Sequence, residues 1–285
     1  MTILFDGIAS GVLLFLVSVG LAVTLGLMNF VNLAHGAFAM AGGYVCVTLL
    51  NRLGAPFLLT LPLAAAAAAL LGVVLERLLY RRLYRASHLD QVLFSIGLVF
   101  VAVSSAQYLF GAQQQPLQLP PMLSGQLHLP GMDVGVYRLF LIVIGLALAF
   151  VLQWMVAHTA FGARLRASVD NPRAARGLGI DVDRVFVATF ALGSGLAGLG
   201  GALGVEMLGL DPEFPLKYIV YFLIVVAVGG SGNIKGSLLA SLLLGLFDVV
   251  GKYYVPQIGA FVIYAVMIVV LIFRPQGLFG RVIVR

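Results

Sequence analysis

The sequence predicts an all-α integral membrane protein: a polytopic helix bundle of about eight transmembrane helices, with one broken or re-entrant segment near the N-terminus. Of its 285 residues, 61% are hydrophobic and only 10% are charged, which is more apolar sequence than a soluble core of this size can bury. The apolar residues form long runs, and the arginines gather between those runs. We therefore expect a single transmembrane domain over residues 1–285.

Eight apolar runs approach or reach the roughly 20 helical residues that cross about 30 Å of hydrocarbon. In chain order they are Ile8–Met28, Phe57–Leu79, Leu89–Phe110, Leu139–Ala157, Val185–Val205, Tyr218–Gly230, Ser237–Tyr254 and Ile258–Phe273. The sixth run is short. Small residues such as those at 64–69 suit close helix packing in lipid.

Basic residues orient the predicted bundle, because cytoplasmic loops carry an excess of Lys and Arg. Three basic clusters are therefore expected inside: Arg77, Arg81, Arg82 and Arg85; the loop Ala163–Arg184; and Arg274, Arg281 and Arg285. The segment Gly111–Tyr137 has no Lys or Arg, and we expect it outside.

The apolar segment Phe30–Leu50 decides the side of the N-terminus. If it crosses fully, the chain has nine spans and an outside N-terminus. If it is broken or re-entrant, there are eight spans and the N-terminus is inside. We prefer eight, because Asn32, His35 and Gly36 make a continuous lipid-facing helix costly at the start of this segment.

The same interruption provides the candidate translocation pathway, Asn29, Asn32, His35 and Gly36. Asn29, Asn32 and Gly36 have the spacing of one helical face. Buried amides can hydrogen-bond a zwitterionic solute, and glycine permits a break that exposes backbone groups to a cavity. The alternative is that these residues join two helices or satisfy the backbone at a kink.

The loop Ala163–Arg184 is a polar stretch with five arginines in an otherwise apolar chain. It predicts a short helix between Asn171 and Ile180: Asn171 can cap it, Pro172 suits its first turn, and Gly177 and Gly179 end it. A short, capped, charged helix on the cytoplasmic face predicts docking to a soluble partner. The alternative is a solvated basic loop placed only by the positive-inside bias.

Two acidic residues lie within or at the end of apolar runs. For Glu76 we expect an interfacial ion pair with Arg77, with Tyr80 within reach. For Asp248 we expect a pair with Lys252, four residues later on the same helical face. An acid within the membrane is otherwise a candidate functional group.

Several functions are excluded by the motifs. The G-x-G-x-x-G run Gly193–Gly198 follows no strand and lies in a predicted span, and the run Gly229–Ser237 has Lys-Gly where a phosphate loop has Gly-Lys. We expect no ATP site, no catalytic residues, no metal site and no cofactor. The net charge of +6 comes from arginines at the ends of apolar runs, so no nucleic acid partner is expected.

Four separated motifs together resemble the LivH-type permeases, the inner-membrane subunits of ABC importers for branched-chain amino acids. They are the runs Leu27–Gly36, Arg166–Ile180, Gly229–Gly236 and Phe273–Gly280. They occur in order along essentially the whole chain.

This resemblance implies a multi-pass protein of the bacterial inner membrane, surrounded by lipid. It also implies two cytoplasmic ABC ATPase subunits, a second homologous permease and a periplasmic substrate-binding protein. In such importers a short cytoplasmic helix of the permease docks in a cleft of the ATPase. By resemblance, the ATPase-coupling residues here are Arg166, Asp170, Asn171, Ala174, Arg176, Gly177, Gly179 and Ile180. Arg166 and Arg176 are expected to pair with acidic residues of the partner.

Two other classes stay open at this stage. An ion-coupled secondary transporter of a small polar solute would need a buried acid that titrates, and Asp248 and Glu76 are its candidates. A channel or membrane scaffold would need no docking helix. Which amino acid or amide is carried is not encoded in any motif.

Overall fold

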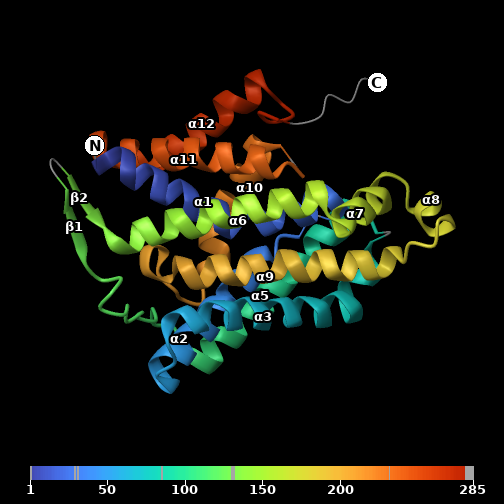
Figure 1. Cartoon of the computed structure of the whole chain (residues 1–285), viewed down its shortest axis with the longest axis horizontal. Helices are drawn as coiled ribbons and strands as arrows, with labels where there is room; N and C mark the ends of the chain where they lie inside the picture. Colours follow the sequence, from blue (N-terminus) through green and yellow to red (C-terminus); the bar gives the residue numbers. More distant parts are fainter. Residues whose placement is uncertain are drawn as a thin grey trace.

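The structure is a computed structural model that describes residues 2–28, 30, 32–84, 86–129, 132–230 and 232–279. Long helices run along one common axis and form an elongated bundle (Figure 1). In chain order the elements are α1 (Thr2–Met28), α2 (His35–Leu53), α3 (Phe57–Leu75), the π-helix η1 (Glu76–Tyr80), α4 (Arg81–Leu83), α5 (His88–Phe110), β1 (Gln126–Leu129), β2 (Met132–Gly135), α6 (Val136–His158), α7 (Ala160–Asp170), α8 (Pro172–Gly177), α9 (Val182–Leu208), α10 (Phe214–Gly229), α11 (Ile234–Tyr254) and α12 (Gly259–Phe273).

All eight predicted apolar runs are helical, which confirms the all-α membrane class. Among the described residues, six helices are long and apolar enough to cross a membrane, and α10 and α12 are shorter apolar helices. The loop that we placed outside adds a feature that we did not predict, the short antiparallel pair β1–β2, in which Leu127 lies opposite Val134.

Two helices, α1 and α9, form the centre of the bundle, and α9 packs on α1, α2 and α3. Glycine makes this approach possible. A Cβ at Gly201 would lie 1.9 Å from the Ala39 carbonyl oxygen, and a Cβ at Gly198 would lie 2.3 Å from Ala68 Cβ. Because lipid is as apolar as the side chains, helices in a membrane associate through such close contact. The run Gly193–Gly198 lies within α9, in agreement with its prediction as part of a span.

The predicted interruption near the N-terminus is confirmed. Phe30 and residues 32–34 are not helical, and α2 begins only at His35. The expected shared helical face of Asn32 and Gly36 is therefore wrong, because Asn32 precedes the helix. Asn29, the other residue of that predicted face, lies outside the described residues.

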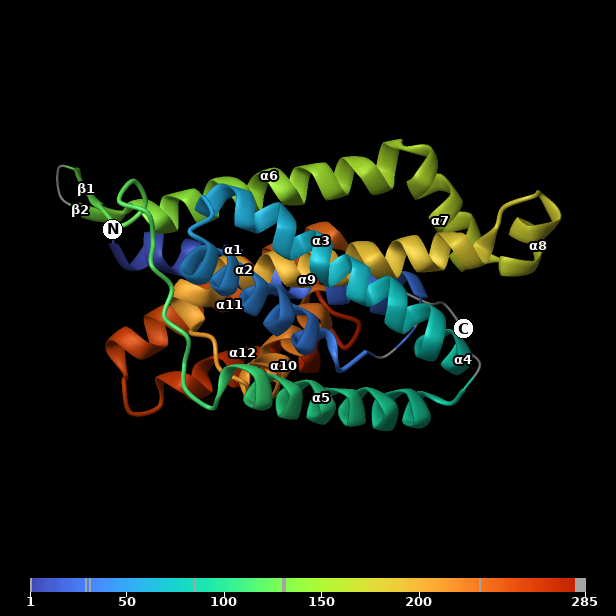
Figure 2. The same ribbon diagram turned by 90° about the horizontal axis from the view of Figure 1, so that it is seen from below.

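The start of α1 lies at the same end of the bundle as the loop that we expected outside. The start of α1 and the β1–β2 pair are at one end, and α8 is at the other (Figures 1 and 2). Asp6 in α1 forms an ion pair with Arg138 at the start of α6. Since α1 and α6 begin at the same end, the chain must run the length of the bundle an even number of times from the start of α1 to the start of α6. The helices on this path are α1, α2, α3 and α5. Hence the broken segment that ends in α2 returns the chain to that end. This favours an outside N-terminus over the inside one that we preferred, and the side itself stays a prediction.

Candidate functional site

The predicted short helix in the loop Ala163–Arg184 is confirmed as α8. Asn171 Oδ1 accepts a hydrogen bond from the Ala174 N–H at 3.0 Å, and Pro172 occupies the first turn. After the helix, Gly179 has a φ of +81°, which glycine adopts without a Cβ clash. The Ile180 N–H then donates to the Ala175 carbonyl at 3.0 Å and closes the C-terminus. Local sequence thus determines this helix.

The tip of α8 carries an exposed leucine. The helix projects from the end of the bundle opposite the β1–β2 pair (Figure 2). Ala175 within this helix is buried, whereas Leu178, which directly follows it, is 81% exposed. Sequence reasoning did not select Leu178, although a single large apolar residue in a polar loop is a usable signal. An exposed apolar side chain on a projecting helix suits burial against a partner.

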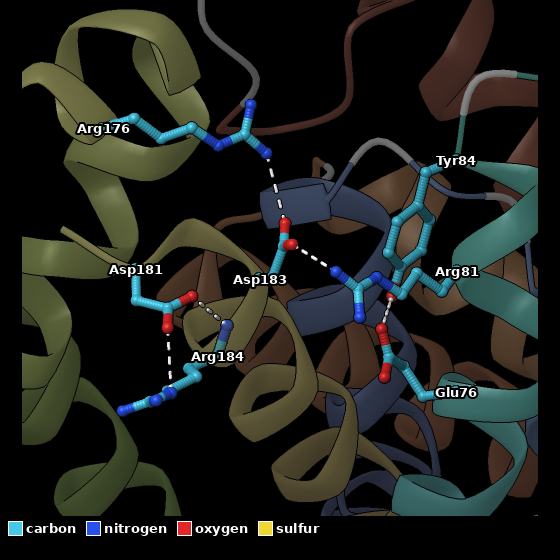
Figure 3. Close-up of polar contacts among 7 residues, drawn as sticks. All are labelled: Glu76, Arg81, Tyr84, Arg176, Asp181, Asp183 and Arg184. Carbon is cyan, nitrogen blue, oxygen red and sulfur yellow. Dashed lines mark hydrogen bonds and ion pairs between the residues drawn. The ribbon is translucent and has the colours of Figure 1, made fainter.

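Asp183, at the start of α9, ties α8 to the rest of the bundle (Figure 3). Its Oδ1 accepts from the Arg176 guanidinium at 3.1 Å, and its Oδ2 forms an ion pair with Arg81 of α4. Asp181 pairs separately with Arg184 at 2.8 Å. The Asp183 pairs are half-exposed, so each contributes at most about 1 kcal/mol to stability. Their effect is geometric: three elements meet at one carboxylate.

The two arginines that we expected to reach a partner have contacts within this chain. Arg176 bonds Asp183, and Arg166 donates to the Val156 carbonyl near the end of α6. Asp170, at the end of α7, is exposed. Arg166 therefore holds α7 against α6, and Arg176 holds α8 against α9.

The π-helix η1 changes the expected partner of Glu76. The Glu76 residue is 1% exposed, and its Oε1 accepts a hydrogen bond from the Tyr84 hydroxyl at 2.8 Å. The predicted pair with Arg77 is wrong, since among the described residues Glu76 forms no ion pair. Burial, and then the Glu76 carboxylate, raise the pKa of the Tyr84 phenol far above its usual range, so Tyr84 remains a donor.

The described candidates for the translocation pathway are buried and in contact. The Asn32 side-chain carbonyl accepts from the Ala34 N–H at 3.1 Å and from the Tyr80 hydroxyl at 2.9 Å. His35 Nε2 lies 2.9 Å from the Val17 carbonyl oxygen. A Cβ at Gly36 would lie 2.9 Å from Pro215 Cα. These contacts join the break before α2 to α1, η1 and the start of α10.

Two cavities lie beside this segment rather than at it. An apolar cavity of about 740 Å³ lies between α2, α3 and α5. A second cavity, of about 470 Å³, lies between α1, α6, α9, α10 and α11, and Asp6, Arg138, Asp248 and Lys252 are among its lining residues. The predicted pair of Asp248 and Lys252 is confirmed at 2.7 Å.

Over residues 3–271 the chain matches the family described as the permease component of branched-chain amino acid transport systems. It is 26% identical to the high-affinity branched-chain amino acid transport permease BraD of Pseudomonas aeruginosa, over 98% of this chain and 95% of that protein. It is 28% identical to the probable branched-chain amino acid transport permease LivH of Methanocaldococcus jannaschii, over 94% and 89% of the two chains. Identity to LivH of Escherichia coli K12 is 24%, over 98% and 94%. No solved structure matches the chain.

Proposed function

Because this chain belongs to the family of permease components of branched-chain amino acid transport systems, we propose that it moves a branched-chain or related amino acid inward as one half of an ABC importer. It is a multi-pass permease subunit of the inner membrane, and its family works with ATPase and binding-protein partners. The proposal extends to two cytoplasmic ATPases, a second homologous permease that completes the pathway, and a periplasmic protein that delivers the amino acid.

The observation that carries this proposal is the projecting helix α8 with its exposed Leu178. In the proposed complex α8 enters a cleft of the ATPase, and Leu178 is buried there. The docking surface extends over the coupling residues at 170–180, with Asn171 and Gly179 fixing the shape of the helix. Arg176 holds that helix against α9, and Arg166 holds the preceding helix α7 against α6.

Contacts within the bundle support a route from α8 to the break before α2. Asp183 joins Arg176 of α8 to Arg81 of α4. Tyr80 directly precedes Arg81 and donates to Asn32. Closure of the ATPases would pull α8, move η1 through Asp183, and change the surroundings of the proposed pathway residues Asn29, Asn32, His35 and Gly36. The driving energy is the difference in ATPase affinity between the inward-open and outward-open states.

The test is co-purification of an ATPase with the tagged permease from detergent extracts. Leu178→Glu places a charge at the proposed contact, and we expect it to reduce the co-purified ATPase at least tenfold. Gly179→Arg should do the same, but it also strains the positive φ, so Leu178→Glu is the cleaner variant.

The matched control is Leu53→Glu, a leucine that is 71% exposed at the outer end of α2. It should retain the ATPase. If the wild-type chain brings down no ATPase, the importer proposal fails, and an ion-coupled transporter becomes the leading explanation. If Leu178→Glu retains the ATPase, α8 is not the docking element.

A further inference from the structure

Arg81, which directly follows the π-helix η1, lies near two acids (Figure 3). Its guanidinium forms an ion pair with Asp183, which also accepts from Arg176 of α8 at 3.1 Å. The second acid is Glu76, the first residue of η1, and the charges of Arg81 and Asp183 both act on its carboxylate. Among the described residues no ion pair joins Glu76 to Arg81. One base thus has two acids near it and pairs with only one of them.

The π-turn explains why Glu76 and Arg81 are near each other. In an α-helix, residues five apart point in different directions, because one turn holds 3.6 residues. In η1 the Arg81 N–H donates to the Glu76 carbonyl oxygen, which is the i to i+5 bond of a π-helix. This wider turn brings the two side chains toward the same face. Single π-turns inside α-helices are frequent at functional sites.

Glu76 has a carboxylate oxygen without a hydrogen-bond donor. The residue is 1% exposed, and its Oε1 accepts from the Tyr84 hydroxyl at 2.8 Å. Its Oε2 is buried and has no partner among the described residues. A buried polar atom without a partner is costly and needs an explanation. Here a favourable bond is left unmade close to a guanidinium.

The two acids near Arg81 differ in their exposure. The Asp183 side chain is 46% exposed, and an ion pair at such a position contributes little to stability. A bond from Arg81 to the buried Glu76 would be stronger, because charge-assisted hydrogen bonds gain strength away from water. The desolvation of the guanidinium opposes this exchange. Either pairing can therefore prevail, depending on the position of Asp183 relative to α4.

We propose that Arg81 has two positions: on Asp183 in this structure, and on Glu76 Oε2 when the ATPases draw α8 and the start of α9 away from α4. Glu76 is a positioning residue, which stabilises the second state by accepting the released guanidinium. This inference rests on the proposed function and adds to it the group that replaces the Asp183 contact. Tyr80 directly precedes Arg81 and donates to Asn32 at 2.9 Å. The exchange thus takes place next to the contact that joins η1 to the break before α2.

The charge of Glu76 is tested with Glu76→Gln, which keeps the size of the side chain and an oxygen that can accept from Tyr84. We expect ATP-driven uptake of tritiated leucine per assembled complex to fall at least threefold, with a normal amount of co-purified ATPase. Asp248→Asn is the matched control, since Asp248 is the other buried acid in the described part of the chain and likewise has one unbonded oxygen. It should keep wild-type uptake. Wild-type uptake by Glu76→Gln, or an equal loss in both variants, overturns the proposal.

A double-mutant cycle shows whether Glu76 acts through Arg81. Arg81→Gln removes the guanidinium, and we expect it to lower uptake at least as much as Glu76→Gln does. The double variant should transport no less than Arg81→Gln alone, because the Glu76 charge has no effect on coupling once its partner is gone. If the two losses multiply instead, Glu76 acts independently of Arg81 and the exchange does not occur.

The movement itself is measured as the distance between spin labels on Arg82→Cys in α4 and Ala174→Cys in α8, two exposed positions. The native Cys46 is buried, so it should take up little label. In the purified permease with its co-purifying subunits, trapping with ATP and vanadate should add a second distance to the one found without nucleotide. Glu76→Gln should reduce the fraction at this second distance at least threefold.

The outcomes separate the exchange from the importer function. One unchanged distance with and without trapping overturns the exchange, and ATP-driven leucine uptake by the same preparation would leave the importer function intact. An equal fraction at the second distance in the wild type and Glu76→Gln also overturns it. A wild-type complex without ATP-driven uptake would refute the importer function and the exchange together.

Discussion

Asn32 shows how one buried amide connects three parts of this protein. Its side-chain carbonyl accepts from the backbone of Ala34 and from the Tyr80 hydroxyl, and the residue is 2% exposed. Removal of that acceptor leaves the buried Tyr80 hydroxyl without a partner, which costs about 1–3 kcal/mol. The amide therefore stabilises the break before α2 whether or not it also meets the transported solute.

We predict that Asn32→Ala assembles but transports at least threefold less amino acid per assembled permease. Tyr80→Phe should lower uptake as well, because it breaks the same contact from the other side. Ser95→Ala is the control: it removes a buried hydroxyl whose one hydrogen bond among the described residues goes to the Val92 carbonyl of its own helix. Uptake is measured in proteoliposomes and normalised to the amount of assembled complex. Wild-type uptake by Asn32→Ala would remove this residue from the pathway.

At the residue scale, the sequence predicted contacts within one regular segment. It did not predict contacts across an irregular turn or between residues far apart in the chain. The Asn171 cap and the Asp248–Lys252 pair follow from spacing along one segment. The bond from Tyr84 to Glu76 did not follow, because it spans η1, where a π-turn departs from the 3.6-residue period that spacing arguments assume. The contact of Tyr80 with Asn32 joins residues 48 positions apart.

At the scale of elements, Asp183 links α8, α9 and α4 through its ion pairs with Arg176 and Arg81. Asp183→Asn keeps the shape of the side chain and removes the charge that attracts Arg81 and Arg176. We expect the ATPase to co-purify normally and unfolding stability to change by about 1 kcal/mol or less, because the pairs are exposed. ATP-driven uptake should nevertheless fall several-fold while ATP hydrolysis continues.

The neighbouring Asp181→Asn is the control for that uncoupling. Among the described residues Asp181 pairs only with Arg184, and an asparagine can still cap α9. It should keep uptake and hydrolysis coupled. Equal ratios of uptake to hydrolysis in the wild type and Asp183→Asn would show that the junction carries no coupling. Sequence alone did not identify Asp183, because an acid at the start of a helix is explained by the helix dipole without any partner.

For the whole molecule, hydropathy predicted the apolar helices but not the path of the chain through the membrane. The runs were found because each is apolar over its own length. The predicted side of the N-terminus depended on whether the segment that contains α2 crosses the membrane. Polar residues at the start of that segment suggested that it does not. The structure satisfies those residues internally: Asn32 bonds Tyr80, and His35 bonds the Val17 carbonyl. A polar residue therefore argues against a membrane pass only when no hydrogen-bond partner lies inside the bundle.

This topology gives a last prediction, an outside N-terminus and an inside α8. Thr2 and Ser124 are exposed at one end of the bundle, and Ala174 is exposed at the other. In intact spheroplasts an impermeant maleimide should label Thr2→Cys and Ser124→Cys at once. Ala174→Cys should react only after the membrane is permeabilised, because the arginines around α8 hold it on the cytoplasmic side. The native Cys46 is buried, so the unmodified chain sets a low background. Labelling of Ser124→Cys but not of Thr2→Cys in intact cells would mean that α2 turns back within the membrane, leaving eight passes and an inside N-terminus.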